Sequence, residues 1–463
     1  MTGIYGVILN AGRGSLLAQQ KALEVTGHNI ANVNTPGYSR QIVNLAANEP
    51  IQWGSGLVGT GVKATEVARI YDRFLGLQIN NENQHLGRWE AKKGALERVE
   101  IIFDESSGYG LNQAMSEFWN AWQDLANNPS GNVERVTLLA KSETMTNTFN
   151  NMYSSLEQIQ KDVDVSIGGS VEDINLLTRQ IADLNRKIVD VEVAGQSSND
   201  YRDSRDLLLK ELSSMIDINT FEKSDGSMTV AIKGGKPLVD GSYSWDLSTE
   251  TNAQGFKDIV WVDDDGNTTN VTDDISGGKL RGWIETRDVS VPEYLSRLDN
   301  LAEKIISEVN ALHSSGFGLD GSTGNDFFIG TSASDMDMNQ LVVDDVNLIA
   351  ASGSADGVPG DNSNALAIAG LQNELLMDGN KATFDEYFSS LMSVVGSDVK
   401  EAAANFEHQE SMVAHLDSYR ESISGVSLDE EMVNLVKFQH AYDAAAKLIS
   451  TVDEMLNTVV NMV

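Results

Sequence analysis

The chain has 463 residues, enough to bury a large core and to divide into two or more domains. Its 68 acidic and 33 basic side chains give a formal net charge of -35, which disfavours binding to nucleic acid and to anionic membrane surfaces. The chain has no cysteine, which excludes disulfides, thiolate catalysis and cysteine-bound metals. No apolar run approaches the roughly 20 residues that span a bilayer, so we expect no membrane insertion.

The first thirty residues show a helical pattern. Large apolar residues recur every seven positions, at Leu9, Leu16, Leu23 and Ile30. This spacing predicts an amphipathic helix with one apolar stripe. The helix is expected to end at residues 34–38, NTPGY, because proline followed by glycine is typical of a type II turn.

A glycine-rich segment follows between residues 41 and 70. Gly54, Gly56 and Gly59 form a G-x-G-x-x-G, which is found in dinucleotide-binding loops. Such a loop requires a helix after its last glycine, whereas the residues from Val62 onward alternate as a strand does. The pattern therefore favours an extended arm over a nucleotide site.

In the middle of the chain, the spacing of the apolar residues changes twice. Apolar residues at intervals of three and four predict long bundle helices between about 73 and 193, and again between about 291 and 312. Between 216 and 284 the period falls to two, and three Asp-Gly dipeptides predict hairpin turns. We therefore expect an antiparallel β domain inserted into a helical body, with a partly extended connector at residues 314–361.

The last stretch of the chain carries the longest heptad pattern. The apolar residues of its two interleaved series are Leu428, Leu435, Phe438, Tyr442, Ala445, Ile449, Val452, Leu456 and Val459. A helix with an apolar stripe of this length requires a partner helix, and the N-terminal helix is the candidate. The alternative is that the two terminal helices are ordinary amphipathic helices packed on a globular core.

Together these patterns predict a multidomain, mainly α fold. Its terminal helices pair as a coiled coil, its body is an elongated helical bundle, and an antiparallel β domain is inserted into that body. The expected boundaries are residues 1–70 with 424–463 for the terminal helical domain and its extended arm, 71–215 with 285–423 for the helical body, and 216–284 for the β domain.

Motifs that carry chemistry are missing from the sequence. The six histidines show no close metal-ligand spacing, and neither a G-x-S-x-G nucleophile elbow nor a phosphate-binding loop occurs. The acidic run at residues 263–267 does not match a calcium loop, because the closing glutamate is missing. We therefore predict no catalytic residue, no cofactor, no metal and no enzymatic activity.

Residues 29–38, NIANVNTPGY, resemble the N-terminal signature of the bacterial flagellar axial proteins, which include rod, hook and hook-associated subunits. The runs at 39–41, 59–62, 69–72, 277–288 and 309–313 are similar to the hook-filament junction subunits of that family. The run at 424–442 resembles their C-terminal signature. The resemblance covers both ends and the helical body, and it is weak across the β insertion.

The resemblance implies a structural subunit that joins hook to filament, located outside the cell and exported without a cleaved signal peptide. It implies hook protein, the second hook-associated protein, copies of the chain itself and an export chaperone as partners. The residues implied for assembly at the N-terminus are Leu9, Leu16, Leu23, Ile30, Asn32, Asn34, Thr35, Pro36, Gly37 and Tyr38. Those implied for assembly and chaperone binding at the C-terminus are Leu428, Leu435, Phe438, Tyr442, Ile449, Val452, Leu456 and Val459.

Two alternatives remain open at this point. Within the same class, a hook or distal rod subunit shares the N-terminal signature. From a different class, the chain would be a secreted adhesin or enzyme that acts through its β insertion.

Overall fold

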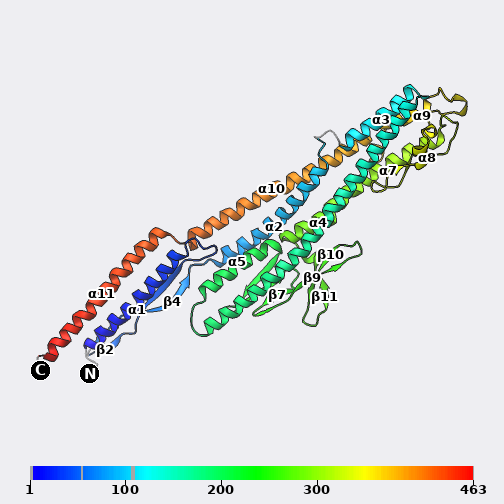
Figure 1. Ribbon diagram of the computed structural model, residues 1–463. Helices are drawn as coiled ribbons and strands as arrows, with labels where there is room; N and C mark the ends of the chain where they lie inside the picture. Colours follow the sequence, from blue (N-terminus) through cyan, green and yellow to red (C-terminus); the bar gives the residue numbers. More distant parts are fainter. Residues whose placement is uncertain (1–3, 54–55, 106–109, 462–463) are drawn as a thin grey trace.

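The computed structural model describes residues 4–53, 56–105 and 110–461. It is a long rod in which the first and last helices lie side by side at one end, so that both termini are found there (Figure 1). The helices of the described part are α1 (Ile4–Ala31), α2 (Arg73–Ile102), α3 (Leu111–Asn127), α4 (Asn132–Val193), α5 (Asn199–Met215), α6 (Gly278–Glu285), α7 (Val291–Ser315), α8 (Gln340–Asp344), α9 (Ser363–Gly370), α10 (Phe384–Ser424) and α11 (Leu428–Asn461). The mainly helical, multidomain fold expected from the sequence is confirmed.

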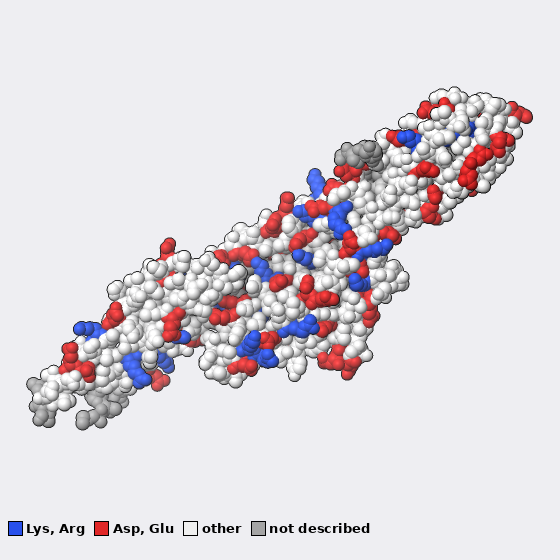
Figure 2. All heavy atoms as spheres, viewed as in Figure 1, with Lys and Arg blue, Asp and Glu red and all other residues white. Residues whose placement is uncertain are grey.

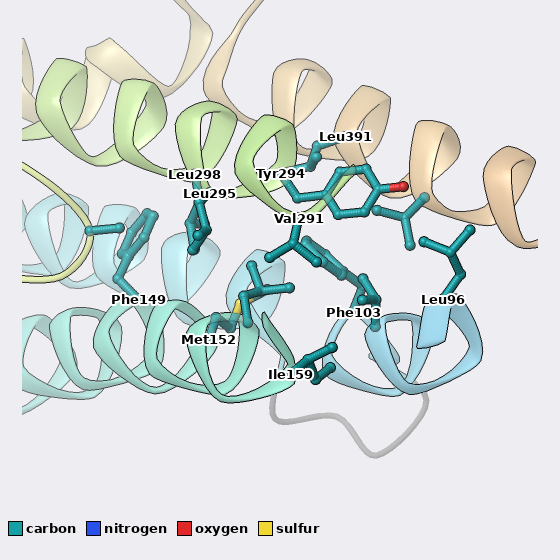
Figure 3. Close-up of a cluster of buried hydrophobic side chains, with 14 of the residues drawn as sticks. Leu96, Phe103, Phe149, Met152, Ile159, Val291, Tyr294, Leu295, Leu298 and Leu391 are labelled. Atoms are coloured by element: carbon teal, nitrogen blue, oxygen red, sulfur yellow. The ribbon is translucent and has the colours of Figure 1, made fainter. Parts of the chain in front are cut away.

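The middle of the rod is a bundle of α2, α4, α7 and α10. Each of these helices places an apolar residue every third or fourth position, and most of these residues meet in one continuous core. Leu75 and Ile79 of α2 form a separate cluster with Leu416 of α10. Figure 3 shows part of this core, in which Phe149 and Met152 of α4, Phe103 at the end of α2, Tyr294 of α7 and Leu391 of α10 fill the space between the helices. The length of α4, 62 residues, sets the length of the body.

The end of the rod far from the termini is closed by aromatic packing. Trp119 of α3 stacks on Phe384 of α10, with ring centroids 5.8 Å apart. Phe327 of the connector after α7 packs against Trp122, at 5.2 Å between centroids. The connector holds two short strands, β12 (Phe328–Ile329) and β13 (Asp337–Met338), and it lies across α4 and α7.

The β insertion consists of two small antiparallel sheets that pack along α4. One has the order β5-β6-β7-β8 and the other β9-β10-β11. Their strands are β5 (Ile218–Glu222), β6 (Met228–Ile232), β7 (Pro237–Asp240), β8 (Tyr243–Ser244), β9 (Leu247–Thr251), β10 (Lys257–Val262) and β11 (Thr268–Asn270). The three Asp-Gly dipeptides join β5 to β6, β7 to β8 and β10 to β11, as their turn chemistry predicts.

The expectation of β structure up to residue 284 is wrong at its end. Residues Gly278–Glu285 form α6, in which Leu280 and Ile284 are one helical turn apart and buried. This short helix packs on α2 and therefore belongs with the body. Its eight residues are too few for a helical period to stand out in the sequence, so tertiary packing decides their conformation.

A buried arginine fastens the insertion to the body. Arg287 lies in a π-helical turn between α6 and α7 and is fully buried. Its Nη1 donates to Asp164 Oδ1 of α4 at 2.8 Å and to the carbonyl of Lys257 in β10 at 2.7 Å. One guanidinium thus links the long helix, the second sheet and the α6–α7 turn.

The segment after α1 forms a β ribbon beside that helix. Strands β1 (Gln41–Ala47) and β4 (Val62–Arg69) pair antiparallel with a bulge, and β2 (Ile51–Trp53) pairs with β3 (Gly56–Val58) in a hairpin between them. This is the extended arm that the sequence predicted. Gly61 has a φ of +95° and lies against Ala11, where an added Cβ would be 2.8 Å from the Ala11 Cα.

Acidic side chains are scattered along the visible face of the rod, with basic ones interspersed among them (Figure 2). In the described part of the chain, no helix is long and apolar enough to cross a membrane. That part also lacks any group of three or more His, Asp or Glu side chains that could hold a metal ion.

Candidate assembly site and the joint beneath it

The two terminal helices pack closely because α1 has a small residue where α11 crosses it. A Cβ on Gly12 would lie 2.8 Å from Ile449 Cγ1, closer than real Cβ contacts come. Ala18 and Ala22 of α1 and Ala445 and Val452 of α11 are buried in the same region. At this point the two helices approach closely because a glycine of α1 meets two large side chains of α11, Leu448 and Ile449.

The predicted stripe of α1 is only half-buried. Leu9, Leu16, Leu23 and Ile30 each keep intermediate exposure, whereas Val25 and the alanines beside it are buried. The reason is that α1 has two partners, α11 on one side and the β1–β4 ribbon on another. The heptad pattern identified the helix, but it could not show that a ribbon shares the buried face.

The predicted residues of α11 fall into three groups. Val452 is buried, while Leu435, Phe438, Ile449 and Leu456 are half-buried. Leu428, Tyr442 and Val459 are exposed. In this single chain, α1 therefore buries only part of the predicted apolar stripe of α11.

The N-terminal motif forms the turn that follows α1. Asn32 donates to the carbonyl of His28 at 3.0 Å, and the Thr35 hydroxyl donates to Asn32 Oδ1 at 3.0 Å. Gly37 has a φ of +79°, as the predicted turn requires, and it faces Leu207 of α5. The three residues between Val33 and Gly37, namely Asn34, Thr35 and Pro36, are exposed.

Beneath this turn lies a buried polar cluster centred on Asn29, which we call the joint. The Asn29 side chain exchanges two hydrogen bonds of 2.9 Å with the backbone of Gln41. It also donates to Glu431 Oε2 of α11 at 3.2 Å and accepts from the Tyr38 hydroxyl at 2.8 Å. Burial, together with the nearby carboxylates, raises the pKa of Tyr38, so the phenol stays protonated as a donor.

Arg40 ties the joint to both sides of the break between α10 and α11. Its backbone N–H donates to the carbonyl of Ser424, the last residue of α10, at 2.8 Å. Its guanidinium donates to Glu431 Oε1 and to Glu430 Oε2, both at 2.7 Å. Because Glu431 is only 2% exposed, this ion pair is shielded from water.

Acidic residues of α5 complete the joint from the side of the body. Gln41 donates to Asp200 Oδ1, and the backbone N–H of Ser39 donates to Asp203 Oδ2. Arg69, at the end of β4, bridges Asp203 and Asp206 at 2.7 Å each. Burial raises the pKa of Asp203 despite these bonds. The joint thus connects α1, the ribbon, α5, α10 and α11.

The sequence predictions missed the partners that make this joint. One signal was present: Glu431 stands three residues after Leu428, at a position where the later heptads have Phe438, Ala445 and Val452. A charged residue in such a place needs a buried partner. That the partner would be Arg40, almost four hundred residues away, was not visible.

The chain is a rod of helices with paired termini, and it carries a flagellar signature at residues 29–38 and another at residues 424–442. This combination is that of a flagellar axial subunit. Residues 9–38 match the family model described as flagella basal body rod protein. Residues 419–462 match the one described as flagellar basal body rod FlgEFG protein C-terminal. The chain between them matches, over residues 96–328, the model described as flagellar hook-associated protein FlgK helical domain.

The chain belongs to the FlgK family of flagellar hook-associated proteins. It is a structural subunit of the hook-filament junction of the bacterial flagellum. The helical-domain match favours this assignment over a hook or rod subunit, the alternative within the same class.

Individual relatives agree with this assignment over nearly the whole chain. Flagellar hook-associated protein 1 of Bacillus subtilis is 32% identical, over 98% of this chain and 97% of its own. The protein of the same name from Salmonella typhimurium is 26% identical, over 98% and 99%. A solved structure of the flagellar hook junction protein FlgK from Burkholderia pseudomallei has the same fold, with a TM-score of 0.68 and 15% identity. That match covers 75% of this chain and all of the other.

Proposed function

We propose that the α1–α11 pair builds this subunit into the hook-filament junction. In this proposal the pair contacts hook protein on one side, the second hook-associated protein on the other, and copies of the same chain around it. The N-terminal and the C-terminal residues that the sequence analysis assigns to assembly supply these contacts. The role is structural, and the proposal assigns no enzymatic activity.

One observation carries this proposal. The helix α11 packs on α1 along one side, yet it exposes large apolar residues elsewhere. These are Leu428, Met432, Val433, Val436, Tyr442, Leu448, Met455, Val459 and Val460, each between 37 and 71% exposed. An exposed apolar surface of this length on one helix is typical of an interaction site.

The same surface bears on export and on the proposed domain boundaries. We propose that the chain leaves the cell unfolded, without a cleaved signal peptide, and that a chaperone covers α11 until then. A chain free of cysteine suits passage in an unfolded state. We also propose that residues 1–70 with 424–463 form one domain, joined to the body at Arg40 and Asp203.

The deletion of this gene, examined by electron microscopy, tests the proposed role. Cells without the protein should carry hooks that lack filaments, and flagellin should accumulate in the medium. Cells that lack hooks would indicate a hook or rod subunit instead. Normal flagella would overturn the proposal.

A pair of variants in the complemented strain tests the assembly element. Ile449 lies against Gly12 of α1, whereas its neighbour Ser450 is exposed. Ile449→Asp should reproduce the deletion phenotype although the purified variant keeps the urea transition of its helical body. The matched control Ser450→Asp should restore filaments. Filaments on Ile449→Asp cells would show that the helix pair is not the assembly element.

A further inference from the structure

Three glycines lie inside the long helices of the body without a steric reason. They are Gly94 of α2, Gly169 of α4 and Gly396 of α10, and a Cβ added to any of them would have none of the surrounding described residues within 4 Å. At Gly87 and Gly282, by contrast, an added Cβ would lie 2.0 and 2.2 Å from a backbone oxygen of a neighbouring helix. A glycine inside a helix weakens that helix relative to alanine. Close packing explains the last two glycines, and the first three need a different explanation.

The glycines of α2 and α4 lie at nearly the same level of the rod. Gly94 lines a surface pocket together with Val163 and Ser166 of α4. Gly169 follows Ser166 by three residues, which is about 4.5 Å along the helix axis. Residues 166–170 read SIGGS, and sharp bends in helices occur at such glycine and serine pairs. The longest helix of the body thus has its glycine pair beside Gly94 of α2.

The glycine of α10 lies at this level as well. Gln409 of α10 donates to the carbonyl of Glu82 in α2 at 3.1 Å. Further out, the ring centroids of Phe388 and Phe103 are 6.3 Å apart. The same number of residues separates these two contacts on each helix, so the antiparallel pair keeps one register between them. In that register the glycine of α10 lies within one residue of the position opposite Gly94.

The fourth helix of the bundle, α7, begins near this level after an irregular turn. Residues 286–290, directly before α7, form the π-helical turn that contains Arg287. Gln160 of α4 donates to the carbonyl of Arg287 at 2.7 Å, and Arg287 in turn donates to Asp164, one turn of α4 from Gly168. Short π-helical turns are frequent at functional sites. All four helices thus have a glycine or an irregular turn within about 15 Å of the rod's length, which we call the flexure level.

The flexure level separates two parts of the body. On its inner side α4 holds the β insertion, where Asn175 donates to the carbonyl of Leu247 at 2.7 Å. On its outer side α4 holds the connector, where Asn150 donates to the carbonyl of Met336 at 2.9 Å. Figure 1 shows the same division, with the sheets of the insertion beside the inner part of α4 and α8 and α9 at the far end of the rod. Each part of the body therefore carries its own attached segment.

We propose that the body bends at the flexure level, so that the outer part of the rod tilts against the part that carries the β insertion and the terminal helices. This inference concerns the single chain and does not rest on the proposed function. Bending lengthens the backbone hydrogen bonds on the outer side of a helix, and water compensates for them where the backbone is exposed. Gly94 and Gly169 are exposed. Because the glycines share one level, the helices bend together instead of resisting one another.

Hydrogen exchange of the purified full chain, followed by mass spectrometry, tests whether the helices bend together. Gly169→Ala fills open space and should slow exchange of the amides beside it about five-fold, because alanine favours the helix over glycine by that factor. We expect the same variant to slow exchange beside Gly94 and Gly396, although neither lies on α4. Slowing that is confined to α4 would show separate weak points and would overturn the proposal.

Gly27→Ala in α1 is the matched control. Gly27 is also inside a helix, and a Cβ added there would have none of the surrounding described residues within 4 Å, but it lies in the terminal domain. This variant should slow exchange in α1 and leave α2, α4 and α10 unchanged. Slowing of those three helices in the control would show that their exchange follows the stability of the whole chain, which would also overturn the proposal.

A distance between two spin labels measures the tilt itself, because the chain has no cysteine of its own. Ser334→Cys in the connector and Thr269→Cys in β11 place labels at exposed positions on opposite sides of the flexure level. The control pair, Gln180→Cys with Thr269→Cys, has both labels on the inner side. We expect a broader distribution of distances for the first pair than for the second. Equal widths would refute the tilt.

The triple variant Gly94→Ala, Gly169→Ala and Gly396→Ala connects the tilt to the glycines. In this background the distribution of the first label pair should narrow to that of the control pair. An unchanged width would overturn the proposal. If the width is unchanged and cells that express the triple variant also fail to build filaments, the exposed glycines serve a contact with another subunit instead.

Discussion

Acidic pH is predicted to destabilise the far end of the rod through one buried histidine. His313, near the end of α7, is 1% exposed. Its Nδ1 lies 2.7 Å from the carbonyl of Asn325, and its Nε2 accepts from the backbone N–H of Ala350 at 3.0 Å. The first contact requires a proton on Nδ1, and the second requires Nε2 to be free of one. A second proton would therefore break the bond to Ala350.

Burial lowers the pKa of His313 to about 4, from an ordinary value of 6.5, and the nearby charge of Arg135 acts in the same direction. Because the pKa is lower in the folded chain, protonation favours unfolding. The stabilisation is complete above about pH 6.5 and is lost as the pH falls toward 4. A shift of this size corresponds to about 3 kcal/mol in full, and to roughly 2.5 kcal/mol at pH 4.5.

Urea unfolding at pH 7 and pH 4.5, followed by circular dichroism, measures this loss. His313→Gln cannot take up the proton, so between the two pH values it should lose about 2.5 kcal/mol less than the natural chain. His408→Gln, which changes an exposed histidine of α10, should behave as the natural chain does. The carboxylates titrate in all three proteins and cancel in the comparison. Equal losses in the three proteins would refute the assignment of His313 as the buried neutral group.

Three further predictions concern packing. Phe149→Ala, in the fully buried bundle core, should lower the free energy of unfolding in urea by about 3 to 5 kcal/mol; a loss below about 1 kcal/mol would contradict the packing described. Arg287→Met leaves Asp164 without its buried guanidinium partner and should cost about 3 kcal/mol in the same assay, with no loss if the link is unimportant. Gly12→Val should abolish swimming in the complemented strain while Gly27→Val, where the added Cβ meets nothing within 4 Å, should not; swimming of both would refute the close helix contact.

Local patterns were sufficient for most of the architecture. The helical period of α2, α4, α7 and α10 is repeated over many turns, so apolar spacing alone located these helices. The three Asp-Gly turns of the insertion have conformational requirements that few other dipeptides meet. The pairing of the two terminal helices also followed from their heptads, because each seam requires a partner.

The contacts of the joint could not be predicted from such patterns. Asn29, Arg40 and Asp203 are polar, fall outside any period, and meet only because α1, the ribbon and α5 converge. Their partners are up to 402 positions away in the chain. No spacing within one element encodes a contact of that kind.

The sequence by itself determined that this is a long helical rod with an inserted β domain, paired termini and a flagellar signature at each end. These properties depend on period, turn chemistry and motif, which are local. Only the tertiary structure decided that residues 278–285 join the helical body, that α1 lies between α11 and a β ribbon, and that Glu431 pairs with Arg40. These properties depend on which surfaces meet in three dimensions, and burial of a surface is settled by the whole fold.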